Sequence, residues 1–216
     1  MNILLATPCL TGITHTYANS LVQTVQGFEL HKIPFNTLFL ANESCIMRAR
    51  NDIAHYAMTS PEKYTHLLMV DSDMGWEWDT FVHLANAKRR IISAVCVKKT
   101  YPIEEVVHHL DGEVIEPSGV IKVRHSPVAF MLLDLSVIRD HAKVIDDYSC
   151  VSAITGKRAI IKNLFATGPD ENGNFQSEDF AFTSLMRKCG ESIYLHTRAK
   201  TTHTGLHTFR PGAKCD

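Results

Sequence analysis

Apolar segments and helical segments alternate along the first 75 residues, and this alternation constrains the fold more than any other feature of the chain. Residues 2–7, 33–40 and 67–70 have the composition of buried strands, while residues 15–27 and 46–58 carry apolar side chains at helical spacing. Strands that alternate with helices are typical of an open sheet whose neighbouring strands run parallel. We therefore expect an α/β fold that is Rossmann-like, with a mostly parallel open sheet flanked by helices.

The remaining segments continue this alternation less evenly. Residues 103–123 favour irregular structure or a hairpin, residues 144–156 carry no clear period, and residues 168–175 consist largely of turn formers, which predicts a loop. The last predicted helix begins at Ser177 as a cap, with two acids in its first turn. The further expected strands are 91–97, 128–135 and 193–195, and the further expected helices are 79–87, 136–142 and 177–189.

The predicted strand at residues 67–70 runs directly into two carboxylates, Asp71 and Asp73. Residues two apart at the end of a strand project to the same side of the chain. Carboxylates at the rim of an apolar core are costly unless they are hydrated, paired or bound to a cation. Because ligands of parallel α/β sheets bind at the carboxyl ends of the strands, this pair marks a candidate divalent-metal site, with an ordinary Asp turn as the alternative.

Length, charge and cysteine content narrow the class of protein. The chain has 216 residues, which suits one domain over residues 1–216. Its net charge of −1 gives no overall electrostatic reason to bind nucleic acid or an acidic membrane. No apolar run reaches the roughly 18 residues of a membrane span. Six scattered cysteines favour reduced thiols, so we expect a cytoplasmic protein, in the host cytoplasm if it is viral.

Five short motifs follow one another along the chain. They are Thr7-Pro8 after the first strand, Arg48-Ala49-Arg50-Asn51 in a helix, Asp71-Ser72-Asp73 after an apolar strand, Ser177-Glu178-Asp179-Phe180 at a helix start, and His203-Thr204-Gly205. In this order and spacing the chain resembles the GT-A fold nucleotide-sugar glycosyltransferases that carry a DxD motif, in a compact version of the bacteriophage type. The resemblance extends from about residue 2 to residue 207 and implies the GT-A form of the α/β fold expected above.

The resemblance assigns Asp71 and Asp73 to the DxD motif, which in the family binds Mn²⁺ or Mg²⁺ against the diphosphate of the donor. The resemblance implies that Asp73 is the direct metal ligand. Asp71 would contact the metal, a metal-bound water or the ribose, and Ser72 would lie beside the nucleotide. His203 matches the family's carboxyl-terminal histidine, which is a further metal ligand or a phosphate contact. His207 competes with it for this role.

Two other motifs correspond to donor-binding segments of the family. Thr7 and Pro8 match the loop that cradles the nucleotide base. Arg48 and Asn51 are three residues apart and so share a helix face, where family members contact the nucleotide or position the motif acids. For Arg50, which lies between them, we favour an ordinary solvated cation on the helix surface.

The acids Glu178 and Asp179 have two interpretations. Acids in the first turn of a helix interact favourably with its dipole and its free N–H groups. In the family, an acid at this motif deprotonates the acceptor hydroxyl of inverting enzymes. On that resemblance Asp179 is the first choice for the catalytic base and Glu178 the second, and retention of configuration would need neither.

The resemblance as a whole implies a metal-dependent enzyme that transfers a hexose or pentose from a nucleotide sugar, with UDP favoured, to a hydroxyl of a glycan, a protein or a modified base of phage DNA. A nucleotidyltransferase and an inactive nucleotide- or carbohydrate-binding module are the alternatives. The basic groups Lys88-Arg89-Arg90 and Lys98-Lys99 are either solvated surface or contacts to a phosphate-rich acceptor. The sequence leaves the donor sugar, the acceptor and the oligomeric state open, and suggests no membrane partner.

Overall fold

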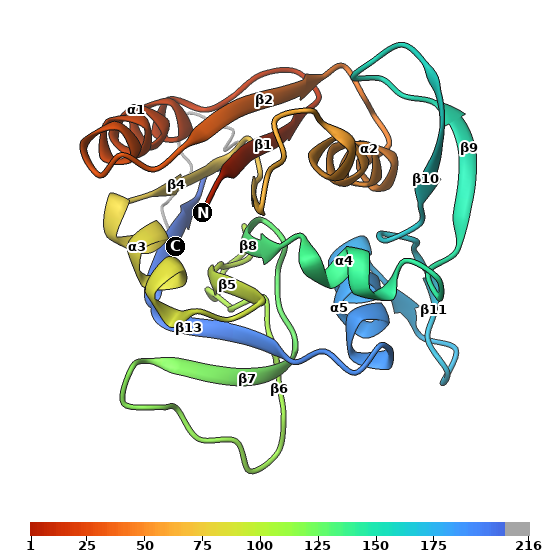
Figure 1. Ribbon diagram of the computed structural model, residues 1–216. Coiled ribbons are helices and arrows are strands. Elements are labelled where there is room, and N and C mark those ends of the chain that lie inside the picture. Colours follow the sequence, from red (N-terminus) through yellow and green to blue (C-terminus); the bar gives the residue numbers. More distant parts are fainter. Residues whose placement is uncertain (206–216) are drawn as a thin grey trace, which may run out of the picture.

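The computed structural model of the protein describes residues 1–205, whose elements are arranged as in Figure 1. The helices are α1 (His15–Leu30), α2 (Ile46–Thr59), α3 (Trp78–Ala87), α4 (Ser136–His141) and α5 (Glu178–Lys188). The strands are β1 (Ile3–Cys9), β2 (Phe35–Ala41), β3 (His66–Val70), β4 (Met74–Trp76), β5 (Ile91–Val95), β6 (His108–His109), β7 (Val120–His125), β8 (Phe130–Asp134), β9 (Asp147–Val151), β10 (Arg158–Lys162), β11 (Gly168–Pro169), β12 (Phe175–Gln176) and β13 (Ile193–His203).

One mixed sheet forms the centre of the molecule, in the order β2-β1-β3-β8-β5-β13-β7-β6, and β4 pairs with β13 beside this path. β1 is parallel to β2 and β3, and β13 is parallel to β5. β8 lies antiparallel between β3 and β5, so β2, β1, β3, β5 and β13 all run in one direction. The predicted Rossmann-like α/β sheet of mostly parallel strands is confirmed, and the carboxyl ends of these strands meet at one edge.

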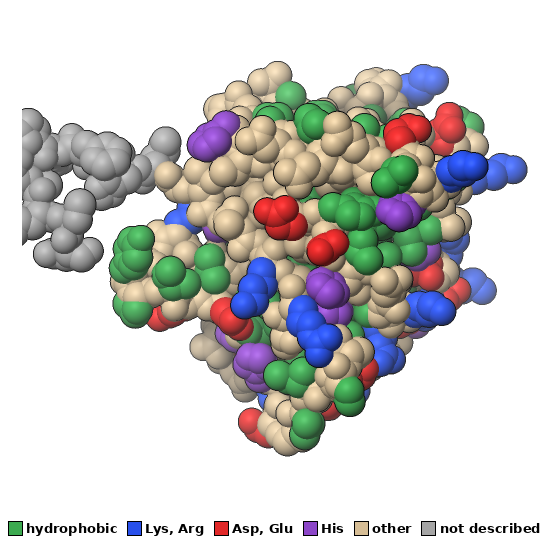
Figure 2. All heavy atoms as spheres, turned by 90° about the vertical axis from the view of Figure 1, so that its left-hand side faces the viewer, with side chains coloured by type: hydrophobic (Ala, Val, Ile, Leu, Met, Phe, Trp, Pro, Cys, Tyr) green, Lys and Arg blue, Asp and Glu red, His purple; other side chains and the backbone are tan. Residues whose placement is uncertain are grey.

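Helices cover both faces of the sheet (Figure 1). α1 and α3 pack on one face over a core that includes Phe28 and Phe81, and α2, α4 and α5 pack on the other over Ile53 and Phe182. The side that α1 and α3 cover carries acidic and basic side chains interspersed with one another (Figure 2). Within residues 1–205, no helix has the length and apolarity needed to cross a membrane.

β13 is the largest departure from the elements predicted above. The sequence predicts a strand only at residues 193–195, but β13 continues to His203 and pairs with β7, β5 and β4 along its length. Its second half is polar, with an irregular step between His196 and Lys200, and so lacks a strand pattern. Pairing on both sides extends the strand here, because strand formation depends on the neighbouring strands more than on intrinsic propensity.

Two other segments form or extend strands that the sequence does not predict. The unpatterned residues 144–156 contain β9, which forms a hairpin with β10. β1 continues to Cys9, so Thr7 and Pro8 belong to the strand and not to a loop after it. β3 pairs with β1 only as far as Ala6. The missing N–H of Pro8 lies on that side of β1, where no strand needs a hydrogen bond from it, so a proline fits at this position.

α1 packs closely against α3 at Gly27, where a Cβ atom would lie 2.5 Å from ring atoms of Trp78. Alanine favours a helix by about 1 kcal/mol over glycine, but the packed Trp78 ring has to move. We expect Gly27→Ala to lower the free energy of unfolding by about 1–3 kcal/mol in urea denaturation, as overpacking does. Gly12→Ala is the control, because nothing lies within 4 Å of its added Cβ. Equal stability of the two variants would contradict the close contact.

Candidate functional site

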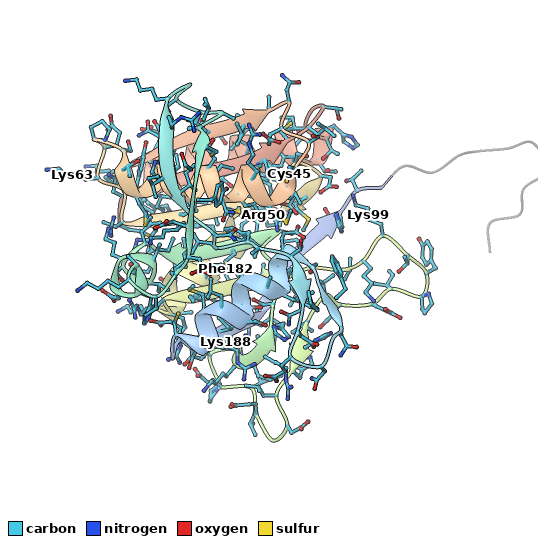
Figure 3. All side chains as sticks on the ribbon, turned by 90° about the vertical axis from the view of Figure 1, so that its right-hand side faces the viewer. Cys45, Arg50, Lys63, Lys99, Phe182 and Lys188 are labelled. Atoms are coloured by element: carbon cyan, nitrogen blue, oxygen red, sulfur yellow. The ribbon has the colours of Figure 1, made fainter. Side chains whose placement is uncertain are left out.

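Arg50 on α2, which is labelled in Figure 3, joins the two acidic motifs of the chain. Its Nη2 atom donates to both carboxylate oxygens of Asp71, at 2.8 and 3.0 Å. Its Nη1 atom donates to Glu178 at 3.0 Å and also to Asp179. Asp71 follows β3, whereas the other two acids open α5. One guanidinium group therefore brings the end of a central strand and the start of a late helix to the same place.

Arg50 is 1% exposed, so the expectation of a solvated surface cation is wrong. The helix pattern contains the signal for its burial, because Arg50 lies three and four residues before Ile53 and Ala54 and so shares their buried face. A buried guanidinium needs partners for its charge and its fork of N–H donors. Burial opposes this charge, but the surrounding carboxylates outweigh it and raise the pKa of Arg50.

The side chain of Asp179 is largely buried beside Arg50, with 16% of it exposed. Burial raises the pKa of Asp179 above its ordinary value. Arg50 opposes that rise, while the nearby charges of Asp71 and Glu178 add to it. Both acids do lie in the first turn of α5. A carboxyl group with a raised pKa is a stronger base when ionised, which suits proton abstraction near neutral pH.

The pairing of β4 with β13 brings Asp73 and His203 together. Met74 lies opposite His203 in the register, and the Thr204 N–H donates to the Asp73 carbonyl oxygen at 2.9 Å. The His203 Nε2 atom is 3.4 Å from the Asp73 carboxylate, and its Nδ1 atom is 2.7 Å from the Val97 carbonyl oxygen. A carbonyl partner at one ring nitrogen orients the other one, as in metal-binding histidines.

Lys99 completes this cluster, since its ammonium group pairs with the Asp73 carboxylate. The sequence pattern indicates Lys99 only as part of the basic pair Lys98-Lys99. Burial alone would raise the pKa of Asp73, but hydrogen bonds from His203 and Lys99 outweigh this effect and lower the pKa to about 2. The hydrogen bond to Asp73 in turn raises the pKa of His203. Asp73 is therefore an ionised ligand or ion-pair partner at neutral pH.

The residues predicted to bind metal fit a divalent ion in part. Asp73 and His203 offer an oxygen and a nitrogen that face one another, but both carboxylate oxygens of Asp71 bind Arg50. Among residues 1–205, no group of three histidine, cysteine or acidic side chains is arranged to hold a metal ion. Asp73 and His203 could therefore supply only part of an ion's ligands, and metal binding at this cluster stays a prediction. His207 lies outside the described residues.

Thr7, Pro8 and Ser72, which were predicted to contact the nucleotide, lie at the carboxyl ends of β1 and β3. The Thr7 hydroxyl is buried and shares a hydrogen bond with the hydroxyl of Tyr17, whose pKa is raised by burial. The Ser72 carbonyl oxygen accepts from the Thr14 N–H at 3.0 Å and so ties the end of β3 to the start of α1. These contacts shape the edge of the sheet, and contact of these residues with a nucleotide stays a prediction.

Arg48 and Asn51 point to different partners although they share a helix. The Asn51 side-chain oxygen accepts from the backbone N–H groups of Leu164 and Phe165 at 2.9 and 3.1 Å, and so holds α2 against the segment that follows β10. Arg48 is largely exposed and its Nε atom is 3.0 Å from Glu43. Neither side chain is bonded to the acids that hold Arg50, and a nucleotide contact for either one stays a prediction.

Comparisons with known proteins bear on the fold. No protein-family model matches the sequence, and no curated protein is significantly similar to it. A197 from STIV superimposes with a TM-score of 0.51 and 12% identity over 99% of both chains. S. aureus TarS 1-349 in complex with UDP-GlcNAc gives a TM-score of 0.44 and 13% identity over 100% of this chain and 62% of that one. A glycosyltransferase involved in the glycosylation of the major capsid of PBCV-1 gives a TM-score of 0.36 and 11% identity, over 67% of this chain and 65% of that one.

The full-length match and the arrangement of the sheet agree with each other. The match to A197 from STIV covers 99% of both chains. In this chain the parallel strands end at one edge, where the two acidic motifs meet at Arg50. This is the α/β architecture that the alternation of strands and helices in the sequence predicts. The chain therefore has a Rossmann-like α/β fold, which it shares over nearly its whole length with A197 from STIV.

Proposed function

We propose that this protein is a metal-dependent glycosyltransferase that moves a sugar from a nucleotide-sugar donor, with UDP as the nucleotide, to an acceptor hydroxyl. One observation carries the proposal: Arg50 joins Asp71, from the predicted donor motif, to Glu178 and Asp179, from the predicted base motif. A transferase of this kind needs its donor site and its base within reach of one sugar carbon. The meeting of the two motifs at the carboxyl edge of the sheet supports this arrangement.

In the proposed reaction Asp179 accepts the proton of the acceptor hydroxyl. The acceptor oxygen forms a bond to the anomeric carbon while the bond from that carbon to the diphosphate oxygen breaks. The nucleoside diphosphate leaves with the electron pair, and the configuration at the anomeric carbon is inverted. The burial that raises the pKa of Asp179 favours this proton transfer, and Arg50 holds the carboxyl group in position.

Asp73 and His203 are the residues that would hold Mn²⁺ or Mg²⁺. The imidazole nitrogen favours Mn²⁺ over Mg²⁺, which prefers oxygen ligands. A bound ion supplies positive charge against the leaving diphosphate. Lys99 pairs with Asp73. If Asp73 were to hold an ion, the Lys99 ammonium group could pair with a phosphate oxygen instead.

We expect Asp73→Ala to remove the dependence of UDP binding on Mn²⁺, weakening binding by about tenfold or more, which corresponds to about 1.4 kcal/mol. The reason is that Asp73 is the one ionised carboxylate that faces His203 in this cluster. Isothermal titration of UDP with and without Mn²⁺ measures the effect. Asp111→Ala, which removes an exposed acid in a turn, is the control. An unchanged affinity in Asp73→Ala would rule out the metal assignment.

A thermal-shift screen of nucleotide sugars tests the proposed function as a whole. We expect at least one UDP-sugar to raise the melting temperature in the presence of Mn²⁺, because a ligand that binds only the folded state stabilises it. Slow release of UDP from that sugar, with water as the acceptor, would then identify the donor. If no nucleotide sugar is bound or hydrolysed with either metal, the protein is a binding module of another kind and the proposal fails.

A further inference from the structure

The basic groups that the sequence suggests as anion contacts are mostly occupied by acids of the chain itself. Four of their five cations form ion pairs, which are Arg89 with Glu116, Arg90 with Asp140 and Glu191, Lys98 with Glu104, and Lys99 with Asp73. Three other cations differ from them, namely Arg124 on β7 and Arg187 and Lys188 on α5. Within residues 1–205 these three cations make no ion pair, although all three line one cleft.

This cleft has a volume of about 330 Å³. β7 contributes Arg124 and His125, α5 contributes Arg187 and Lys188, and the hairpin of β11 and β12 closes the third side. The lining also includes neutral hydrogen-bonding groups, such as Gln176, whose amide donates to Ser184 at 3.0 Å. Three converging cations with neutral donors between them are the chemistry that binds a phosphate or carboxylate group.

The charges around the cleft favour one anionic group over a long polyanion. Asp170 and Glu171 also line it, so the formal charge of the ionised groups is 3 − 2 = +1. The Asp170 carboxylate is occupied by the N–H groups of Asn172 and Asn174, at 2.9 and 2.8 Å. Two acids at the same cleft, on a chain of net charge −1, would repel the neighbouring charges of an extended polyanion such as DNA.

His125, which also lines the cleft, responds to the same cations. It is 7% exposed, and its Nδ1 atom is 3.0 Å from the Thr183 hydroxyl. Burial, together with the positive charges of His108, Arg187 and Arg124, lowers the pKa of His125 to about 4. Asp170 acts in the opposite direction. His125 is therefore neutral at physiological pH and leaves the arginines as the groups that attract an anion.

α5 connects this cleft to the candidate base. Asp179 lies in the first turn of the helix and Arg187 in its last, so they are about 12 Å apart along the helix axis at 1.5 Å per residue. Figure 3 shows Lys188 at the end of α5 that points away from Arg50. The cleft and the candidate base thus lie at opposite ends of the same helix.

We propose that the cleft of Arg124, Arg187 and Lys188 is a subsite for the acceptor, and that the acceptor is a glycan bearing a phosphate or carboxylate group. The proposal rests on the proposed function, because it takes Asp179 as the base toward which this glycan is oriented. It adds the chemical class of the acceptor, which the proposed function leaves open. The anionic group is held in the cleft, and the hydroxyl that receives the sugar lies toward the start of α5.

Titration of the ¹⁵N-labelled protein with glucose 6-phosphate, glucuronate, glucose and a single-stranded DNA 12-mer, followed by NMR, tests the subsite. We expect the two anionic sugars, and not glucose, to shift amide signals of residues 168–176 and 184–188. The stronger of the two identifies phosphate or carboxylate as the group recognised. Arg124→Gln combined with Arg187→Gln is expected to weaken this binding about tenfold or more, because both guanidinium groups that could make charge-assisted hydrogen bonds to the anion are removed.

Lys143→Gln combined with Lys157→Gln is the matched control, because it removes two exposed cations outside the cleft. Equal binding by the cleft variant and this control would overturn the subsite, and so would tighter binding of the DNA than of either sugar. UDP affinity with Mn²⁺ is measured on the same proteins and is expected to stay unchanged. Loss of UDP binding in the cleft variant alone would assign the cleft to the donor. Absence of UDP binding in the wild type would reject the proposed function while the anion titration still reports on the cleft.

Discussion

Arg50→Met is expected to lower the free energy of unfolding by about 3–5 kcal/mol, as the loss of one partner from a buried ion pair does. Methionine fills a similar volume but provides no charge, so Asp71, Glu178 and Asp179 would be left together without a cation. Arg50→Lys is expected to fall between the wild type and Arg50→Met, because one ammonium group cannot reproduce a planar fork that serves acids on two sides. Urea denaturation measures both variants.

The loss in Arg50→Met is expected to grow as pH rises from about 5 to 8. Without the guanidinium, the buried acids retain protons in the folded state that they release in the unfolded state. Stability falls with increasing pH wherever the folded state binds more protons than the unfolded state. The free energy of unfolding of this variant therefore decreases with pH, whereas it would increase for a protein whose folded state keeps these acids ionised. Arg158→Met, at an exposed arginine, is expected to change stability by no more than about 0.5 kcal/mol at either pH. A loss below about 1 kcal/mol in Arg50→Met, with no dependence on pH, would mean that Arg50 does not hold the acids together.

Asp179→Asn is expected to lower the rate of UDP release from the donor by about 10²–10⁴-fold, the usual contribution of a general base. Asparagine keeps the size of the side chain, but it cannot accept the proton. UDP affinity in the presence of Mn²⁺ is expected to stay within about twofold of the wild type, because the donor ion is assigned to Asp73 and His203. Release of UDP from the donor identified by thermal shift measures the rate, with water as the acceptor.

Two variants separate catalysis from helix stability in this experiment. Asp79→Asn changes the same residue type in the first turn of α3, so it reports the loss of a favourable dipole interaction alone. Glu178→Gln tests the second candidate base, which also binds Arg50. Full activity of Asp179→Asn together with a large loss in Glu178→Gln would move the base to Glu178. Full activity of both variants would favour a mechanism that needs no base at this motif.

The part of the fold that follows from local pattern could be predicted from the sequence. β1, α1, β2, α2 and β3 have continuous apolar strands or helical periods, so their type is set by residues close in the chain. β13 could not be predicted in full, because its polar second half becomes a strand only by pairing with β4 and β5. The β9–β10 hairpin likewise alternates weakly and carries exposed apolar residues such as Val151 and Ile160.

The residues of the candidate site likewise include some that the sequence identifies and some that it does not. Asp71 and Asp73 stand out as acids at the end of an apolar strand, whereas Asp179 and His203 are identified by their resemblance to the family's motifs. The prediction of an exposed Arg50 is wrong, because most charged residues on helices are exposed and only the phase of Arg50 with Ile53 and Ala54 indicates burial. The pairing of Lys99 with Asp73 depends on where a loop folds back, and no local pattern contains that information.

The position of β13 in the sheet also affects how the chain folds as it is made. β13 lies between β5 and β7, yet a ribosome reaches its residues only after every other strand of the sheet has been synthesised. Until then β5 and β7 each present an unpaired edge, which is the feature that promotes aggregation of incomplete sheets. The nascent chain is therefore expected to depend on a chaperone until residue 203 has left the exit tunnel. The strand that carries His203 would then be the one that ends this dependence.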